Sequence, residues 1–169
     1  MTNAMTFEIR EETAADAPVL SSLSAEAFGP GRFARTAYRV REGVPPVPGL
    51  SLTGWLDGVL VGGVRFTAIK IGEQDSGALL GPLVVDPQVK GKGYGKALVG
   101  EGLARAKQEG FRLVLLVGDM PYYGRFGFVP VMSGKVTLPG PVDPGRLLAI
   151  ELETGVLEGV TGKVSAYPR

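Results

Sequence analysis

The sequence of 169 residues contains no cysteine and no histidine. The lack of cysteine excludes disulfide bonds, thiolate nucleophiles and cysteine-ligated metals. The lack of histidine excludes the Ser-His-Asp triad and the HExxH zinc site. We therefore expect no metal site, and any catalysis must use backbone amides, carboxylates, tyrosine, lysine, arginine, serine or a bound cofactor.

An excess of charge of one sign is also missing, because 18 Lys and Arg residues balance 17 Asp and Glu residues for a net charge of +1. This balance gives no reason to expect nucleic acid or an anionic membrane as a partner. No run of 18 apolar residues occurs, and the first residues lack a basic segment followed by an apolar one. The sequence therefore predicts a soluble cytoplasmic protein.

Glycine and proline are in excess, with 26 and 13 residues. Their combined share lies above the average for globular proteins but below the ~25–30% that marks disordered chains. The hydrophobic fraction of 44% is sufficient for a core, and the length fits a single domain. These values predict a folded, turn-rich protein.

Apolar runs and alternating patterns predict a protein rich in strands. The Asp57-Gly58 pair predicts a type I′ hairpin turn between two of them. Pro82 cannot donate a ladder hydrogen bond, so it predicts a bulge within a buried strand. The expected strands span residues 7–10, 50–56, 59–71, 79–85, 112–117, 126–132, 147–152 and 163–167.

Two helices are expected. The first spans residues 13–28 and begins with a capping box formed by Thr13 and Asp16. The second spans residues 94–109, where apolar side chains share one face. Residues 29–48 hold a basic segment and a proline cluster, and they form either a short solvated helix with a loop or a lid over a substrate site.

A glycine-rich loop between a strand and a helix is the most informative segment. It reads Val85-Asp86-Pro87-Gln88-Val89-Lys90-Gly91-Lys92-Gly93-Tyr94-Gly95-Lys96. Its glycines let backbone N–H groups converge beside a helix N-terminus, which suits an anion such as a pyrophosphate. Gly93 follows Lys92 where a Walker A loop needs Ser or Thr, and Lys96 replaces the third glycine of G-x-G-x-x-G loops. A plain turn into a helix remains an alternative.

This loop resembles the coenzyme A loop of the GNAT superfamily of N-acetyltransferases, with its pattern (Q/R)-x-x-G-x-(G/A). The pattern fits from Gln88 or from Lys90, and the spacing from Pro87 favours Lys90. A second segment, Gly118-Asp119-Met120-Pro121-Tyr122-Tyr123-Gly124-Arg125-Phe126-Gly127-Phe128, resembles the tyrosine-bearing element of one bacterial GNAT subgroup. The resemblance covers about residues 7 to 167.

The resemblance implies an α/β (α+β) GNAT fold, in which about four helices flank a mixed, mostly antiparallel, twisted sheet of about six or seven strands. It implies one N-acetyltransferase domain over residues 1–169, with a core at about 7–153 and a closing strand to 167. The implied reaction transfers an acetyl group from acetyl-CoA to a primary amine of a small molecule or peptide. The expected protein is a monomer or a homodimer.

The resemblance also implies the site residues. The backbone of the strand before the loop pairs with the pantetheine arm, and the loop amides hold the pyrophosphate. The expected cofactor-binding residues are Leu83, Val84, Val85, Lys90, Gly91, Lys92, Gly93, Tyr94, Gly95 and Lys96. By the resemblance Tyr123 has the position of the general acid, and its ordinary pKa of about 10 lies close enough to the ~8.5 of a departing thiol for proton donation. The alternative for Tyr123 is core packing beside Phe126 and Phe128, with its hydroxyl bonded to a backbone carbonyl.

No motif marks a general base, and a water chain fits as well as any side chain. The acidic candidates, each otherwise a surface charge, are Glu26, Asp57, Glu73, Asp75 and Asp119. Deprotonating a lysine amine at pH 7 costs about 4.6 kcal/mol, against about 1 kcal/mol for an α-amine. We therefore expect an acceptor amine of lowered pKa. Aromatic residues that line the acceptor pocket or fill the core are Phe33, Tyr38, Trp55 and Phe66.

Two other functions stay open. One is a non-catalytic acyl-CoA-binding module that senses or regulates. The other is an acyltransferase that uses a longer acyl chain or a hydroxyl acceptor. Neither the acceptor nor the acyl-chain preference is encoded in a motif.

Overall fold

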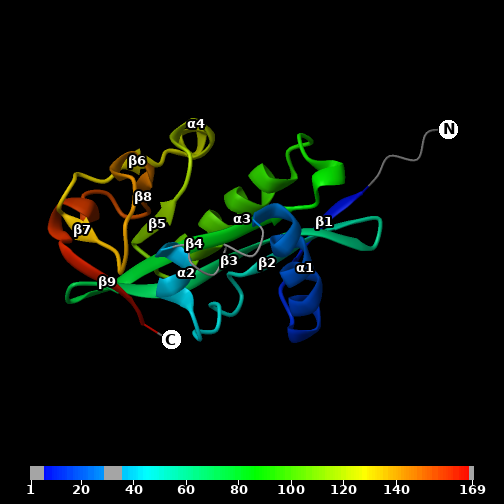
Figure 1. The fold of residues 1–169 in the computed structure, drawn as a ribbon, viewed down its shortest axis with the longest axis horizontal. Coiled ribbons are helices and arrows are strands. Elements are labelled where there is room, and N and C mark those ends of the chain that lie inside the picture. The colour runs from blue at the N-terminus through cyan, green and yellow to red at the C-terminus, as the bar shows by residue number, and fades with distance from the viewer. Residues whose placement is uncertain (1–5, 29–35, 168–169) are drawn as a thin grey trace.

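The computed structural model describes residues 6–28 and 36–167. Residues 29–35, which include Phe33, lie outside this part, as do the side chains of Asp75 and Ser76. Within the described part, nine strands form one sheet, and the same part contains four α-helices (Figure 1). The strands are β1 Phe7–Glu11, β2 Leu52–Leu56, β3 Val59–Ile71, β4 Gln74–Val85, β5 Leu113–Val117, β6 Val129–Pro130, β7 Val136–Thr137, β8 Leu147–Glu151 and β9 Gly162–Ala166. The helices are α1 Ala17–Phe28, α2 Thr36–Arg41, α3 Tyr94–Gln108 and α4 Met120–Tyr123.

The sheet is mixed and mostly antiparallel. Its strand order is β1-β2-β3-β4-β5-β8-β6, and β9 pairs with both β3 and β7. Only the pairs β4/β5 and β7/β9 are parallel among the pairings of the described strands. This arrangement confirms the predicted fold class. The two-residue strands β6 and β7 raise the strand number above the predicted one.

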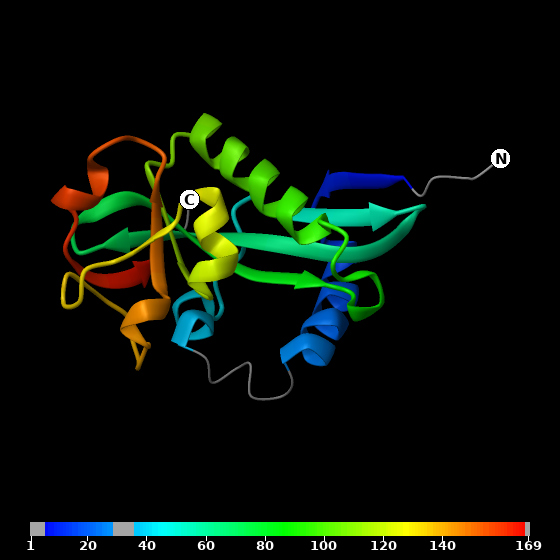
Figure 2. The ribbon, with the colours of Figure 1, turned by 90° about the horizontal axis from the view of Figure 1, so that it is seen from above.

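Helices cover both faces of the sheet. Figure 2 shows α3 on one side of the strands and α1 and α2 on the other. On the α3 side, Phe66 is fully buried, and Gly102 of α3 lies so close that an added Cβ would be 2.6 Å from the Phe66 ring. On the α1 side, Leu20 and Leu23 pack against Leu60 and Val84. Because strand side chains alternate between faces, Val84 of β4 faces α1.

Strand β4 leaves its neighbour β5 halfway along its length. The parallel pairing covers only Gly77–Leu79, opposite Leu113–Leu115, whereas β4 stays paired with β3 to Val85. The register against β3 shifts where Val64 faces Leu83 and Phe66 faces Leu80, so β4 has one extra residue at Gly81-Pro82. This bulge confirms the prediction at Pro82, and the peptide bond before Pro82 is cis. Beyond Leu79, the edge of β4 that faced β5 is therefore unpaired within the described chain.

Local signals placed several turns correctly. Asp57 and Gly58 both have positive φ, of 49° and 80°, as a type I′ turn between β2 and β3 requires. The predicted capping box also forms, and the Thr13 backbone N–H donates to the Asp16 carboxylate over 2.8 Å. Thr13 and Asp16 cap a 3-10 turn, Ala14–Asp16, that leads directly into α1.

The region after α4 differs from the prediction. The strand expected at 126–132 is reduced to β6, because Gly124–Phe126 forms a 3-10 turn and Gly127 adopts a left-handed φ of 103°. Strand β7 lies in a stretch expected to be a loop, and β4 begins at Gln74 rather than at residue 79. Strand β7 forms by pairing with β9, which is distant in the chain, whereas the first residues of β4 pair with β3 across the short turn between the two strands.

Candidate active site

The glycine-rich loop opens a cavity of about 540 Å³ between the end of β4 and the start of α3. Eight of the ten residues predicted to bind the cofactor line it. Of the other two, Val84 faces α1 and lines a different cavity, and Lys92 is exposed outside the lining. The lining residues are Leu83, Val85, Val89, Lys90, Gly91, Gly93, Tyr94, Gly95, Lys96, Tyr122 and Arg125.

Backbone amides at the start of α3 are available to this loop cavity. The helix's first turn closes with a hydrogen bond from the Ala97 N–H to the Gly93 carbonyl, over 3.0 Å. The N–H groups of Tyr94, Gly95 and Lys96 precede that bond and have no acceptor within the helix. Together with the positive helix end and the nearby lysines, these groups form a cradle suited to a pyrophosphate.

Two aromatic contacts hold this cradle in place. The rings of Phe7 and Tyr94 stack at 4.3 Å with planes 16° apart, which ties the loop to β1. The hydroxyl oxygen of Tyr122 lies 2.9 Å from where a Cβ of Gly95 would be, so any side chain at this position meets Tyr122. Gly95 is therefore glycine because Tyr122 approaches the backbone there.

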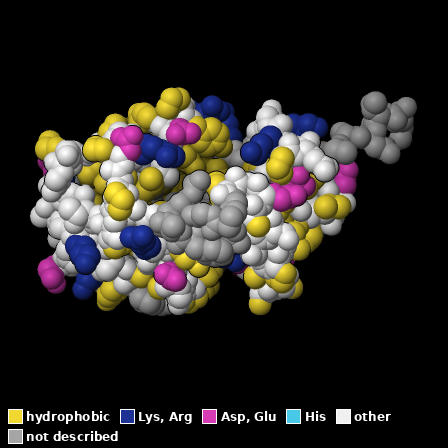
Figure 3. Space-filling model, viewed as in Figure 1, with side chains coloured by type: hydrophobic (Ala, Val, Ile, Leu, Met, Phe, Trp, Pro, Cys, Tyr) yellow, Lys and Arg dark blue, Asp and Glu magenta, His cyan; other side chains and the backbone are white. Residues whose placement is uncertain are grey.

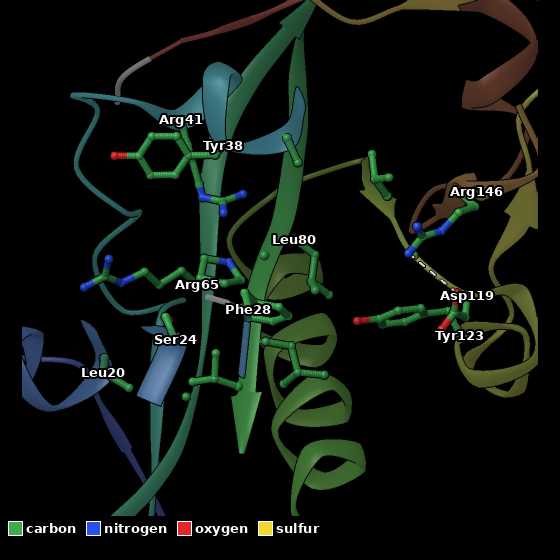
Figure 4. Close-up of a pocket in the computed structure, with 18 of the residues that line it drawn as sticks. Leu20, Ser24, Phe28, Tyr38, Arg41, Arg65, Leu80, Asp119, Tyr123 and Arg146 are labelled. Carbon is green, nitrogen blue, oxygen red and sulfur yellow. Dashed lines mark ion pairs between the residues drawn. The ribbon is translucent and has the colours of Figure 1, made fainter. Parts of the chain in front are cut away.

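A second cavity of about 440 Å³ lies where β4 parts from β5, and we call it the central cavity (Figure 4). Its walls come from α1, α2, β3, β4, the end of β5 and the turn before β8. Leu83 lines both this cavity and the loop cavity. The central lining comprises Leu20, Ser21, Ser24, Phe28, Ala37, Tyr38, Arg41, Gly63, Arg65, Leu80, Gly81, Pro82, Leu83, Val84, Val117, Gly118, Asp119, Tyr123 and Arg146.

Tyr123 extends from α4 into the central cavity (Figure 4). Its ring meets Phe128 edge to face at 5.9 Å and lies against Gly118, where an added Cβ would be 2.5 Å from the ring. The ring packs against the core, as the packing alternative expects, whereas the hydroxyl makes no hydrogen bond to a backbone carbonyl of the described chain. Burial, followed by the nearby Tyr122 and Asp119, raises the pKa of Tyr123 to about 12.

Of the five acidic candidates for a general base, Asp119 lines the central cavity. Its carboxylate lies 3.6 Å from the Arg146 guanidinium. Asp57 accepts a hydrogen bond from the Thr6 N–H at the hairpin turn, and Glu26 and Glu73 are exposed outside the lining. The Asp75 side chain lies outside the described part of the chain.

The aromatic candidates for an acceptor pocket divide in the same way. Tyr38 lines the central cavity. Trp55 and Phe66 do not: the Trp55 indole donates to Thr53 and lies under Arg10, and Phe66 is in the core. The core alternative is confirmed for Phe66, and Trp55 packs against the cluster of Leu20, Leu23, Leu60 and Val84 instead of lining the cavity.

Sequence reasoning missed three arginines of the central cavity as site residues. Arg41 comes from α2, Arg65 from β3 and Arg146 from the 3-10 turn Pro144–Arg146 before β8. Arg41 belongs to the basic segment of residues 29–48, of which Thr36–Arg41 forms α2, and Ala37, Tyr38 and Arg41 line the cavity. No motif joins three residues this far apart in sequence, so the fold alone brings them together.

The surface charge, possible metal sites and possible membrane-spanning helices of the described chain add no further candidate site. Basic and acidic side chains are interspersed on the face seen in Figure 3, in line with the small net charge. The described residues contain no group of three acidic, histidine or cysteine side chains placed to hold a metal ion. None of the described helices is long and apolar enough to span a membrane.

Comparisons with known proteins agree with this architecture. The profile of the Acetyltransferase (GNAT) family matches residues 18–128. The uncharacterized N-acetyltransferase YhbS of Escherichia coli K12 is 31% identical over 160 residues, covering 94% of this chain and 95% of that protein. The crystal structure of E. coli YhbS in complex with CoA superposes with a TM-score of 0.83 at 28% identity, covering 99% of this chain and 93% of that one.

A second solved structure carries the acylated substrate. A GNAT family acetyltransferase from Brucella melitensis, in complex with acetyl-CoA, has a TM-score of 0.61 and 28% identity. The match covers 86% of this chain and 96% of that one. Fold, sequence profile and a relative matched over nearly its whole length agree, and the chain belongs to the GNAT acetyltransferase family.

Proposed function

We propose that the chain transfers an acetyl group from acetyl-CoA to a primary amine, with Tyr123 as the general acid. The observation that carries the proposal is the meeting of two cavities at Leu83: an anion cradle on one side and the Tyr123 hydroxyl on the other. An extended cosubstrate bound across this junction has its phosphates in the loop cavity and its thioester in the central cavity.

The cosubstrate is held by backbone groups in this proposal. The unpaired edge of β4 beyond Leu79 offers hydrogen bonds from Leu83 and Val85 to an extended pantetheine arm. The amides at the start of α3, with Lys90 and Lys96, hold the pyrophosphate. YhbS with CoA and the Brucella melitensis protein with acetyl-CoA support this choice of cosubstrate.

The chemical step forms a carbon–nitrogen bond and breaks the carbon–sulfur bond of the thioester. The acceptor nitrogen loses a proton to Asp119 or to water, and Tyr123 donates its hydroxyl proton to the departing sulfur. A Tyr123 pKa of about 12 exceeds that of an aqueous thiol. The same burial disfavours a thiolate in this cavity and raises the pKa of the departing thiol as well, so the gap between the two pKa values is smaller than a comparison of the buried tyrosine with an aqueous thiol indicates.

We extend the proposal to the organisation of the protein. The whole chain of 169 residues forms one transferase domain that acts in the cytoplasm as a monomer or homodimer. The acceptor is an amine of lowered pKa rather than a protein lysine side chain, since no histidine is available to take a proton at neutral pH.

A thiol-release assay with acetyl-CoA and a panel of small amines, α-amino peptides and lysine peptides tests the proposal. We expect CoA release that depends on the amine and an N-acetylated product by mass spectrometry. Tight CoA binding without release for any acceptor identifies a binding module instead. Faster release from longer acyl-CoAs, or with alcohols, identifies the other acyltransferase.

A further inference from the structure

Glu12 holds a largely buried negative charge beside the central cavity. Its side chain is only 8% exposed, whereas the carboxylates paired with Arg10, Arg105, Arg112 and Arg146 are 44–76% exposed. Burying a carboxylate is costly unless a cation pairs with it. The ion pair of Glu12 therefore differs in kind from these surface pairs.

Arg65 is the partner of Glu12. Its guanidinium donates two hydrogen bonds to the carboxylate, from Nε over 2.9 Å and from Nη2 over 2.8 Å. A bidentate pair of this kind fixes the direction of the arginine as well as its charge. Glu12 directly follows β1 and Arg65 lies in β3, so the pair bridges two strands that β2 separates.

Arg65 lies opposite the bulge of β4 at Gly81-Pro82. The register between β3 and β4 shifts between Val64 and Phe66, the two chain neighbours of Arg65. Because Phe66 packs against α3, Arg65 belongs to the other face of the sheet, which carries α1 and α2. The bulge and Tyr123 both line the same cavity as Arg65.

The contact with Glu12 directs the Arg65 guanidinium away from the proposed reaction centre. In Figure 4, Arg65 extends from β3 on the same side as Leu20, and its charged end is directed away from Tyr123. Arg65 is 33% exposed and contributes to the cavity lining, whereas Glu12 lies outside that lining. The wall at β3 thus presents the apolar stem of an arginine whose charge is already neutralised.

The acceptor is the molecule that this charge affects. The loop cavity, proposed to hold the phosphates, has its own cations, Lys90, Lys96 and Arg125, and shares only Leu83 with the lining of the central cavity. The pantetheine arm and the acetyl group are uncharged. An α-amine has a pKa of about 7.7–8.0, so most of its molecules arrive protonated at pH 7. An unpaired arginine in the cavity wall would repel this ammonium group.

We propose that Glu12 is a positioning residue that sets the charge preference of the acceptor site. By holding the Arg65 guanidinium beside the end of β1, Glu12 allows a cationic amine to enter the cavity next to the bulge. Without Glu12, the same cavity would favour acceptors that carry a carboxylate. Glu12 acts through Arg65 and does not itself contact the acceptor. This inference rests on the proposed function.

Three dipeptide amides with the same reacting α-amine test the inference. Alanyl-glutamyl, alanyl-glutaminyl and alanyl-lysyl amides differ in net charge by one positive unit from each to the next. Glu12→Gln keeps the shape of the side chain and removes its charge. We expect kcat/KM for the lysyl peptide to fall by at least about tenfold relative to the glutamyl peptide, with no change in CoA affinity. An equal loss for all three peptides, or no loss, overturns the inference while leaving N-acetyl transfer intact.

Substitutions of Arg65 give the opposite shift and a rescue. Arg65→Gln leaves the Glu12 carboxylate unpaired, so the preference should move toward the lysyl peptide. The double variant Glu12→Gln/Arg65→Gln removes both charges and should return to the ratio of the unmodified protein. Glu12→Asp keeps the charge and should retain most of the preference. An unchanged ratio in Arg65→Gln, or no rescue in the double variant, overturns the inference, and neither measurement needs Glu12→Gln alone to fold.

Glu101→Gln is the matched control. Glu101 pairs with Arg105 over 3.0 Å on α3, and neither residue lines the central cavity or the loop cavity. The variant removes a carboxylate from an arginine, as Glu12→Gln does, and should leave the ratio between the peptides unaltered. The same shift in both variants overturns the inference, because it would then arise from the net charge of the protein.

Binding gives a readout that does not need turnover. Calorimetry measures the affinity of each dipeptide amide for the complex of the protein with CoA. In Glu12→Gln, the affinity for the lysyl peptide relative to the glutamyl peptide is again expected to fall by about tenfold or more. Affinities that change equally for all three peptides overturn the inference. The expected shift in binding without any thiol release instead overturns the proposed function alone.

Discussion

Tyr122 and Tyr123 are neighbours in the chain, and their rings meet edge to face at 4.9 Å and 87°, yet they line different cavities. Tyr122 faces the glycine-rich loop, with its hydroxyl against Gly95. Tyr123 faces the central cavity. One turn of α4 therefore contacts both the proposed phosphate cradle and the proposed reaction centre, which gives the two tyrosines separable phenotypes.

Removing the Tyr123 hydroxyl is expected to slow the chemical step. Tyr123→Phe keeps the ring packed against Phe128 and Gly118 but removes the proton donor, so kcat should fall by about a hundredfold. The affinity for CoA, measured by calorimetry, should stay the same. Tyr122→Phe is the control, with a smaller effect on kcat. An unchanged kcat in Tyr123→Phe contradicts the assignment.

The raised pKa of Tyr123 predicts the alkaline side of the rate profile. Because burial first, and then Tyr122 and Asp119, raise this pKa to about 12, the hydroxyl keeps its proton at every lower pH used in assays. The kcat should rise as the acceptor amine is deprotonated and then stay level to about pH 11. A fall centred near pH 10, absent in Tyr123→Phe, indicates an unshifted tyrosine instead.

Asp119 is expected to assist in removing the amine proton. Asp119→Asn preserves the shape of the side chain and removes its charge, so kcat/KM should decrease by about tenfold or more if the carboxylate accepts the proton. Steady-state kinetics at several pH values measure the effect. A rate and a pH profile like those of the unmodified protein assign the proton to water.

The close approach of Tyr122 to Gly95 predicts that Gly95→Ala weakens CoA binding and that a second substitution, at Tyr122, restores part of it. A methyl group at residue 95 would lie 2.9 Å from the Tyr122 hydroxyl oxygen. Gly95→Ala should therefore displace Tyr122 or the loop and weaken CoA binding by about tenfold. Adding Tyr122→Phe removes the clashing atom and should restore part of the affinity. Additive defects in the double variant argue against this contact as the cause.

Two glycines of α3 should respond in opposite directions to the same substitution. At Gly102 an added methyl lies 2.6 Å from the buried Phe66 ring, whereas at Gly100 nothing lies within 4 Å. Gly102→Ala is expected to lower the free energy of unfolding by roughly 1–3 kcal/mol. Gly100→Ala should raise it by up to about 1 kcal/mol through helix propensity. Urea denaturation checks both, and equal effects contradict the packing described for α3.

Features set by neighbouring residues were predictable from the sequence. The Asp57-Gly58 turn, the Thr13 cap, the bulge at Pro82 and the glycine-rich loop each depend on local stereochemistry. Strands β6 and β7 were not predictable, because two paired residues leave no periodic pattern. Their pairing depends on partners far away in the chain.

The candidate site also has one part that local sequence predicts and one part that depends on distant residues. The cradle of the loop cavity lies in one nearly continuous segment, so the sequence alone predicts eight of its residues. The central cavity joins α2, β3 and the turn before β8, and nothing in their separate sequences relates Arg41 to Arg146. Phe66 illustrates what the sequence does not predict: an aromatic residue alone does not reveal whether its side chain faces the core or a pocket.

The parting of β4 from β5 also affects solubility. An unpaired strand edge exposes amide and carbonyl groups that a second chain can extend into an intermolecular sheet. Pro82 lies on this stretch of β4 and has no N–H to offer. Walls from α1 and α2 flank the opening. The bulge at Gly81-Pro82 breaks the regular register that a partner strand needs, and so it also limits self-association through an edge that the fold leaves unpaired.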